Sequence, residues 1–259
     1  MTQQIVTFTT DWHSADYYLG ALKGAIISKC NQALAFIDIA QGIQQYQYKD
    51  AAFALRNTYS HFPKNTIHVV TVNDKNINPI PYIVTQFDNH FFITPDSGIM
   101  DLMTQNENYQ SVLLNPTSLH HPTFPELDYI PLAIRHIASK QNITELGTPH
   151  RLREIKYIRP TKDNNTLAGI IISIDGYGNA ITNITKKLLE QASAGRSFSI
   201  LIKGKDRGIE QIHDGYEETA NELIAVFNNA SLLEIAHMNY PANKSLGLLK
   251  GDLIKIIFK

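Results

Sequence analysis

The feature of this sequence that most constrains its fold is a change of hydrophobic pattern near residue 147. Before that point, β-branched and aromatic runs alternate with stretches whose apolar residues recur at helical spacing. This alternation predicts an α/β domain with a mostly parallel sheet. After it, strand-like apolar runs follow one another between turn signals, which is typical of a smaller all-β domain, either a barrel or a sandwich.

Polar chain separates the two patterns. Residues 147–166 carry many charged side chains and two prolines, a composition that indicates a linker. We therefore expect an α/β N-terminal domain over residues 1–155, a linker over 156–166, and a barrel-like β domain over 167–259.

The same patterns predict the individual elements. In the N-terminal part we expect strands at 4–9, 34–40, 66–73, 90–96 and 112–115. We expect helices there at 15–31, 50–61, 98–106 and 129–140, the second beginning with Asp50 as its N-cap. In the C-terminal part we expect strands at 167–175, 197–203, 223–229, 232–237 and 253–258, with turns at Asp175-Gly176, Gly204-Lys205 and Lys250-Gly251.

Charge and composition exclude several classes of function. The 259 residues carry 23 basic and 24 acidic side chains, for a net charge of -1, which argues against nucleic-acid or anionic membrane partners. The single cysteine, Cys30, excludes an internal disulfide, and the scattered histidines indicate no metal site. No apolar run reaches the roughly 20 residues that span a bilayer, and no signal-peptide pattern opens the chain. We therefore expect a cytoplasmic protein.

Asp11 is the first candidate site residue. It follows the predicted strand 4–9, and ligands of open α/β sheets bind at the carboxyl ends of their strands. A carboxylate there is able to accept two hydrogen bonds from a ribose diol. The alternative is that Asp11 caps the helix that follows, near Ser14.

A second candidate is the segment ISIDGYGNAITNI at residues 172–184. A strand ends there in Asp175, and a glycine-containing turn presents Tyr177 and Asn179. An aromatic face together with an amide suits the recognition of a base, whereas the alternative is an ordinary Asx hairpin turn. Asn228 and Asn229 stand at a similar junction between strand and turn, and for them the alternative is again a turn.

Six segments resemble the S-adenosylmethionine (SAM) hydroxide adenosyltransferases, relatives of the fluorinase and chlorinase, in the order in which that family has them. The segments are TTDWHSADYYLGALKGAI, FPKNTIHVVTV, HFFITPDSGIM, ISIDGYGNAITNI, NNASLLEIA and LGLLKGDLIKI. The resemblance covers nearly the whole chain. It implies an α/β domain followed by a barrel-like β domain, in a homotrimer. It also implies a nucleoside site between one subunit's N-terminal domain and its neighbour's C-terminal domain, with SAM as the ligand and no other cofactor.

The resemblance also implies roles for the candidate residues. Asp11 would hold the ribose hydroxyls, and Asp175 would bind the amino group of methionine. Tyr177 and Asn179 would lie against the adenine. Asn228 and Asn229 would help frame the adenine or methionine pocket, and Trp12 takes the place of a family phenylalanine.

The sequence departs from the family at three positions that serve to activate water in its hydroxide-transferring members. The family's aspartate falls on Asn73, its histidine falls on Pro125, and no arginine follows in the loop NDKNINPIP. Asp74, one place further on, is the candidate substitute for the aspartate. The halogenases also lack the aspartate and histidine, so their loss alone does not exclude adenosyl transfer.

Three functions follow from this resemblance. The first is cleavage of SAM by displacement at the ribose C5′, with water or a small anion as nucleophile. The second is a catalytically silent protein that binds SAM or adenosine. The third is a site adapted to an unrelated ligand on a retained fold. The retained Asp11, Asp175 and Asn179 favour the first.

Overall fold

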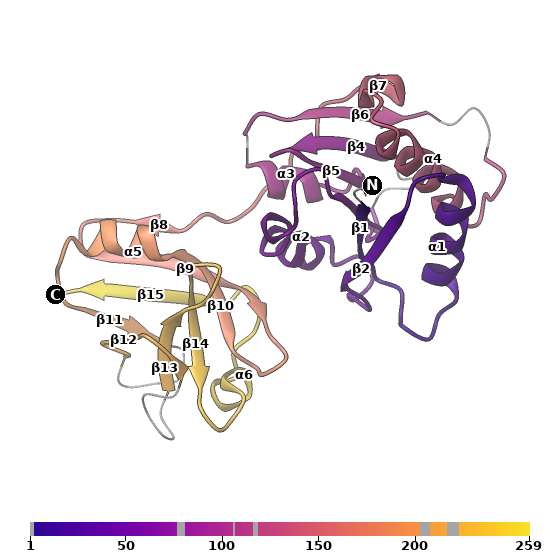
Figure 1. Cartoon of the computed structure of the whole chain (residues 1–259). Coiled ribbons are helices and arrows are strands. Elements are labelled where there is room, and N and C mark those ends of the chain that lie inside the picture. The colour runs from indigo at the N-terminus through magenta and orange to yellow at the C-terminus, as the bar shows by residue number, and fades with distance from the viewer. Residues whose placement is uncertain (1–2, 77–80, 106, 116–118, 203–207, 217–222) are drawn as a thin grey trace. The chain divides into compact units, whose positions relative to one another are not determined.

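The computed structural model describes residues 3–76, 81–105, 107–115, 119–202, 208–216 and 223–259. The chain divides into two compact units, Met1–Ile155 and Lys156–Lys259 (Figure 1). The turn expected at Gly204-Lys205 lies outside the described residues.

The N-terminal unit contains a mixed sheet with the strand order β2-β1-β3-β5-β4-β6-β7. The strands β2, β1, β3 and β5 are parallel, as the alternation of strands and helices predicts, whereas β4, β6 and β7 pair antiparallel. The α/β class is therefore confirmed, with an antiparallel half added to the sheet. The strands are β1 (Gln4–Thr9), β2 (Leu34–Ala40), β3 (Ile67–Val70), β4 (Tyr82–Phe87), β5 (His90–Pro95), β6 (Gln110–Leu114) and β7 (Gly147–Pro149).

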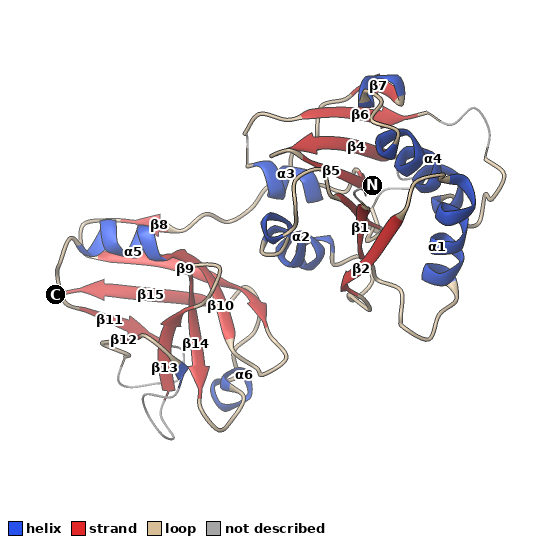
Figure 2. Ribbon diagram, in the orientation of Figure 1, coloured by secondary structure: helices blue, strands red, loops and turns tan. Residues whose placement is uncertain are grey.

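Helices cover both faces of this sheet (Figure 2). On one face, α1 (Tyr18–Lys29) and α4 (Glu126–Ala138) pack against β1 through a buried cluster that includes Leu22, Ile134 and Phe8. On the other face, α2 (Tyr48–Arg56) and α3 (Ile99–Thr104) bury Leu55 and Met100. Because helices cover both faces, the ends of the strands are the place where this kind of sheet binds a ligand.

Some elements differ from the sequence prediction. Helix α2 begins at Tyr48 with Gln47 at its N-cap, so the prediction that Asp50 caps it is wrong, and Asp50 lies in the first turn. The last residues of that predicted helix form a separate 3-10 turn, η1 (Tyr59–His61). Strand β4 was not predicted, because it is almost wholly buried and so lacks the alternation of exposed and buried residues that marks a half-exposed strand.

The C-terminal unit is a curled sheet with the order β11-β15-β9-β10-β14-β13-β12, and β8 pairs with β9. This arrangement confirms the barrel-like β class. The strands are β8 (Thr161–Lys162), β9 (Thr166–Ile174), β10 (Ala180–Thr185), β11 (Phe198–Leu201), β12 (Ile212–His213), β13 (Leu223–Phe227), β14 (Leu232–His237) and β15 (Leu253–Phe258). The helices of this unit are α5 (Lys186–Ser193) and α6 (Ala242–Leu246). The N-terminal unit has one further described 3-10 turn, η2 (Ile143–Glu145). Helix α5 closes the core with Leu189 and Ala192.

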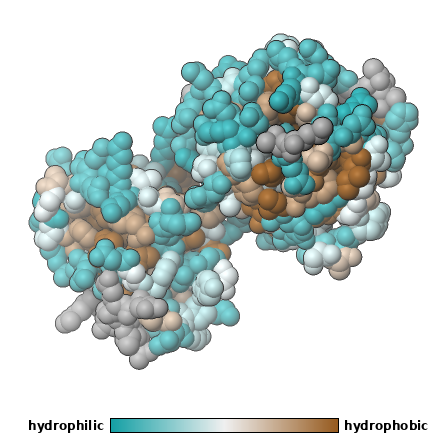
Figure 3. Space-filling view, viewed as in Figure 1, coloured by the Kyte–Doolittle hydropathy of each residue, from teal (hydrophilic) through white to brown (hydrophobic). Residues whose placement is uncertain are grey.

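Hydrophilic side chains cover most of the face seen in Figure 3, and apolar patches appear on both units. Within the part of the chain that the structure describes, no helix combines the length and apolar character needed to cross a membrane.

Candidate functional site

Polar side chains gather at the carboxyl edge of the parallel strands β1, β3 and β5. The register aligns Thr9 with Val70, and Val69 with Ile93, so these strands end side by side. Buried polar groups in proteins almost always have hydrogen-bond partners. The buried side-chain oxygens at this edge that have none among the described residues include those of Thr9, Thr10, Asn73, Thr94 and Ser97. The edge therefore offers several donors and acceptors to a polar ligand.

Asp11 lies at this edge, two residues after β1, and is half-buried. Burial raises the pKa of Asp11, and the negative charge of Glu126 raises it further. Helix α1 begins only at Tyr18, with Tyr17 at its N-cap, so Asp11 does not cap it. The alternative of a helix cap for Asp11 is therefore wrong.

Trp12 extends an aromatic wall beside Asp11. Its ring packs edge-to-face against the Phe124 ring, with centroids 5.4 Å apart, and its centroid lies 5.8 Å from that of the Tyr18 ring. Pro125, which follows Phe124, occupies the N-cap position of α4. The position of the family's histidine is thus a helix start without a titratable side chain.

Glu126, the first residue of α4, is a buried carboxylate that the sequence pattern did not single out. It is 8 % exposed, and Tyr82 Oη donates a hydrogen bond of 2.9 Å to its Oε1. Burial raises the pKa of Glu126, and it raises the pKa of Tyr82 well above its usual range. The signal available in the sequence was an acidic residue in the first turn of a helix, which is usually only a favourable charge near the helix N-terminus.

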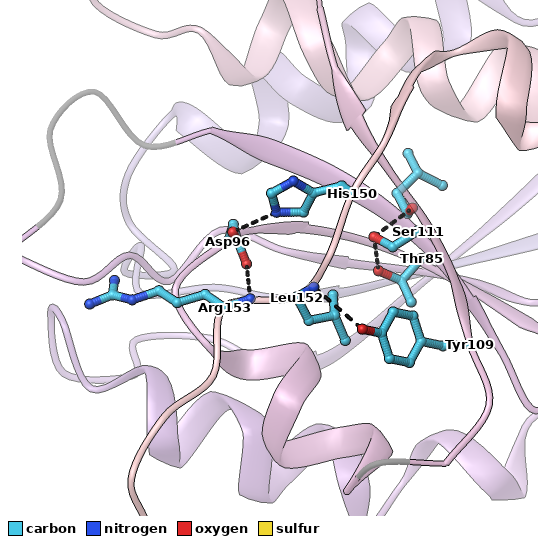
Figure 4. A network of polar contacts seen from close by, with 8 residues as sticks. Thr85, Asp96, Tyr109, Ser111, His150, Leu152 and Arg153 are labelled. Atoms are coloured by element: carbon cyan, nitrogen blue, oxygen red, sulfur yellow. Dashed lines mark hydrogen bonds and ion pairs between the residues drawn. The ribbon is translucent and has the colours of Figure 1, made fainter.

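Asp74 is held by a network that also could not be read from the sequence. Its Oδ1 accepts hydrogen bonds from the backbone and side chain of Asn76, and its Oδ2 lies 3.3 Å from Arg153 Nη1. The backbone N–H of Arg153 donates to Asp96, whose other oxygen lies 2.8 Å from His150 Nε2 (Figure 4). An arginine and a histidine therefore reach this region from the segment after β7, not from the loop after β3.

In the C-terminal unit, the β9–β10 hairpin places Asp175 and Asn179 in contact. Asp175 Oδ1 accepts the backbone N–H of Tyr177 and of Asn179, at 2.9 and 2.8 Å, so the expected Asx turn is present. The Asn179 side chain donates to Asp175 Oδ2 at 3.1 Å and is buried. The Tyr177 ring is 83 % exposed.

Only one of the two glycines in this turn needs its special conformation. Gly178 has a φ of +86°, and a Cβ there would lie 2.5 Å from Pro241 Cβ. Gly176 has no such φ, and no atom would lie within 4 Å of an added Cβ. Gly178 therefore serves the turn through its backbone conformation, whereas Gly176 does not.

Asn228 organises the turn between β13 and β14. Its Oδ1 accepts the backbone N–H of Ala230 and Leu232, and its Nδ2 donates to Glu234 Oε2 at 3.1 Å. Glu234 is 2 % exposed and also accepts a hydrogen bond of 2.8 Å from Tyr216 Oη. The turn that the sequence offered as the alternative is present, and it fixes a buried carboxylate.

A cavity of about 420 Å³ brings these C-terminal residues together. Three carboxylates line it, and no basic side chain does so among the described residues. Its lining residues are Asp175, Ile181, Asp214, Gly215, Tyr216, Val226, Phe227, Asn228, Asn229 and Glu234. Asp175, Asn228 and Asn229 thus share one cavity, whereas Tyr177 is not part of its lining. A cavity of this charge suits a cationic ligand.

Comparisons with known proteins agree with this fold and these segments. The chain is 26 % identical over 266 residues to the (R)-S-adenosyl-L-methionine hydrolase of Methanocaldococcus jannaschii, covering 98 % of this chain and 96 % of that protein. An uncharacterised conserved protein from Thermotoga maritima has the same fold, with a TM-score of 0.85 and 22 % identity over 97 % of this chain and 99 % of that one. A conserved hypothetical protein from Thermus thermophilus gives a TM-score of 0.76 and 20 % identity, over 99 % of this chain and 100 % of that one.

Family models match both units. The SAM hydroxide adenosyltransferase N-terminal domain matches residues 6–147, and the C-terminal domain of the same family matches residues 169–255. Together they cover most of the chain, in the order that the six segments predict. This chain belongs to the SAM hydroxide adenosyltransferase family of enzymes.

Proposed function

We propose that this protein binds SAM and cleaves it by nucleophilic displacement at the ribose C5′. The nucleophile is water or a small anion, and the products are methionine and either adenosine or a 5′-substituted adenosine. The observation that carries the proposal is the anionic cavity in which Asp175, Asn228 and Asn229 meet. SAM has a cationic sulfonium and an ammonium group, which such a cavity attracts. The similarity to an archaeal SAM hydrolase supports the same conclusion.

The chemistry asks little of the protein beyond positioning. The sulfonium is already an activated leaving group, so the carbon–sulfur bond breaks with its electron pair moving to sulfur, and no general acid is required. Holding the nucleophile in line with that bond and removing its water supply much of the rate. The unpartnered polar atoms at the carboxyl edge, including Asn73 Oδ1, are suitable groups to orient such a nucleophile.

The family resemblance and the geometry together support specific roles. Asp11 accepts the ribose hydroxyls, with the Trp12 ring beside it. Asp175 binds the amino group of methionine. Tyr177 and Asn179 contact the adenine, and Asn228 and Asn229 help frame the adenine or methionine pocket. We propose further that the N-terminal edge and the C-terminal cavity serve one ligand through neighbouring subunits of a homotrimer.

Incubation of the pure protein with SAM in ¹⁸O-labelled water tests this proposal. Mass spectrometry is expected to show adenosine that carries ¹⁸O at the 5′ position, with an equal amount of methionine. Parallel incubations with chloride, bromide and other small anions identify any 5′-substituted product. Release of adenine or of 5′-methylthioadenosine instead would show attack at a different position.

The absence of the family's aspartate and histidine, replaced by Asn73 and Pro125, favours a second candidate function. A silent SAM or adenosine sensor would bind its ligand without turnover. Calorimetric binding of SAM without any product above the blank rate between pH 6 and 9 would support the sensor. Failure of both SAM and adenosine to bind would reject both candidates.

A further inference from the structure

A buried carboxylate, Glu126, stands next to the proposed ribose site and has no role in the proposed function so far. It begins α4 and is 8 % exposed. Its neighbour Phe124 touches the Trp12 ring, which directly follows Asp11, so the start of α4 and the end of β1 lie together. The charge of Glu126 acts on Asp11 across this contact.

Tyr82 fixes the position of this carboxylate. Its hydroxyl donates to Glu126 Oε1 at 2.9 Å, and its ring is buried and stacks on Tyr129 with centroids 5.3 Å apart. A buried carboxylate needs a hydrogen-bond donor, but it does not need to stand beside a second carboxylate, which repels it. Such an unfavourable pair is typical of functional sites.

We propose that Glu126 is the general base for the attacking water and that Tyr82 positions it, an inference that rests on the proposed function. The oxygen of the water forms the new bond to the ribose C5′ as the carbon–sulfur bond breaks and its electron pair moves to sulfur. Glu126 takes one proton from the water, the other stays on the new 5′-hydroxyl, and methionine leaves as a neutral thioether. The proton passes afterwards to solvent, so the step balances without any further reactant.

The surroundings of Glu126 suit a base. The titratable groups that interact with it are Asp11 after β1, Tyr82 on β4 and Tyr129 on α4. Asp128, two residues further along α4, instead pairs with His121, whose Nδ1 lies 2.9 Å from Asp128 Oδ1. Burial makes the Glu126 carboxylate more basic by raising its pKa, which brings it closer to the range in which a base works best near neutral pH.

The closing experiment compares Glu126→Gln with the control Glu145→Gln, whose carboxylate is 60 % exposed. Release of adenosine from SAM is measured from pH 5 to 9, and SAM binding is measured by calorimetry. We expect Glu126→Gln to lose about 100-fold or more in kcat, as removal of a general base does. We also expect a SAM dissociation constant within a few-fold of the wild type, loss of the acid limb of the pH profile, and no change in the control.

Tyr82→Phe keeps the aromatic ring and serves if Glu126→Gln does not fold. Because the Tyr82 hydroxyl lowers the pKa of Glu126, its removal is expected to move the acid limb of the kcat profile to higher pH. Suppose that the wild-type protein turns over SAM. This inference alone is then overturned if Glu126→Gln keeps its kcat, or if Tyr82→Phe leaves the acid limb of the kcat profile at the same pH. A wild-type protein without turnover overturns the proposed function and this inference together.

Discussion

At the scale of single residues, Asp11 combines a cost to stability with a proposed role in binding. Its folded pKa is raised above the usual 3.8, so the unfolded chain ionises Asp11 first as the pH rises. The free energy of unfolding therefore falls as the pH rises from the unfolded pKa of Asp11 to its folded pKa. Above the folded pKa the whole loss of stability remains. Asp11→Asn removes the cost but also removes a charged acceptor for the ribose.

We expect Asp11→Asn to raise the free energy of unfolding at pH 8 by on the order of 1 kcal/mol and to leave it nearly unchanged at pH 3.5. Loss of hydrogen bonds to a charged acceptor is expected to weaken SAM binding about 10- to 100-fold. Urea titrations and calorimetry measure the two effects.

Asp16→Asn is the matched control, because Asp16 is exposed and only caps the backbone of His13 in the same loop. Equal effects of the two variants on stability and on SAM binding would contradict the proposed role of Asp11.

At the scale of elements, a buried polar ladder joins three parallel strands. His68 Nδ1 on β3 lies 2.8 Å from Thr7 Oγ1 on β1, and His68 Nε2 lies 3.2 Å from His90 Nδ1 on β5. Burial lowers the pKa of His68 to about 3, and the nearby His90 lowers it as well. As the pH falls below the usual histidine pKa of 6.5, His68 takes up a proton in the unfolded state but not yet in the folded state. The free energy of unfolding therefore falls progressively down to about pH 3.

His68→Gln is therefore expected to flatten the fall of the unfolding free energy between pH 6 and 4, by a few kcal/mol in total. Urea denaturation at several pH values measures this slope. His61→Gln, at an exposed site in the same unit, is the control and should leave the slope unchanged. An unaltered slope in His68→Gln would show that other groups cause the acid sensitivity.

The hairpin between β9 and β10 offers a prediction from a pair of glycines. Gly178→Ala meets a positive φ and the Pro241 side chain, whereas Gly176→Ala meets neither. We expect Gly178→Ala to lower the free energy of unfolding by about 1–3 kcal/mol and to weaken SAM binding through Asp175. Gly176→Ala should stay within about 0.5 kcal/mol of the wild type. Equal denaturation midpoints for the two variants would contradict this assignment.

At the scale of the whole molecule, the proposed site takes its parts from two subunits. Asn229→Trp should block the C-terminal cavity, because Asn229 is exposed and lines it. Asp11→Asn weakens binding at the N-terminal edge. At SAM concentrations well below saturation of either variant, each variant alone is expected to lose most of its activity, whereas co-expression in equal amounts should restore about a quarter of the wild-type activity, the random fraction of intact neighbouring pairs in a closed ring.

Light scattering of the same samples checks that the mixed assembly is a trimer. Mixed samples that remain inactive would place both halves of the site in one chain. A monomer in solution would exclude the shared site altogether.

Local residue pattern accounts for the fold class of both units and for most of their elements. Strands β1, β2, β14 and β15 have the bounds that the residue pattern predicts, because local periodicity and turn residues decide where a strand begins and ends. It also singled out Asp175, Asn228 and Asn229, which meet in one cavity. Local pattern did not reveal β4, since a strand buried on both faces carries no clear period. Helix α5 does carry a local signal, the N-cap Thr185 and the buried Leu189 and Ala192 three residues apart, which the strand prediction for this region did not use.

Packing of the folded chain, and no local pattern, determines which distant residues meet. Tyr82 and Glu126 are 44 residues apart and Asp74 and Arg153 are 79 apart, so no local spacing predicts either contact. The fold brings β4 against the start of α4, where Tyr82 contacts Glu126. It also brings the segment after β7 to the loop after β3, where Arg153 contacts Asp74. The sequence therefore identified the proposed ligand-binding residues that follow their own strands. Packing of the chain supplied the buried carboxylate beside Asp11, because burial and the field of a neighbouring charge depend on the folded arrangement alone.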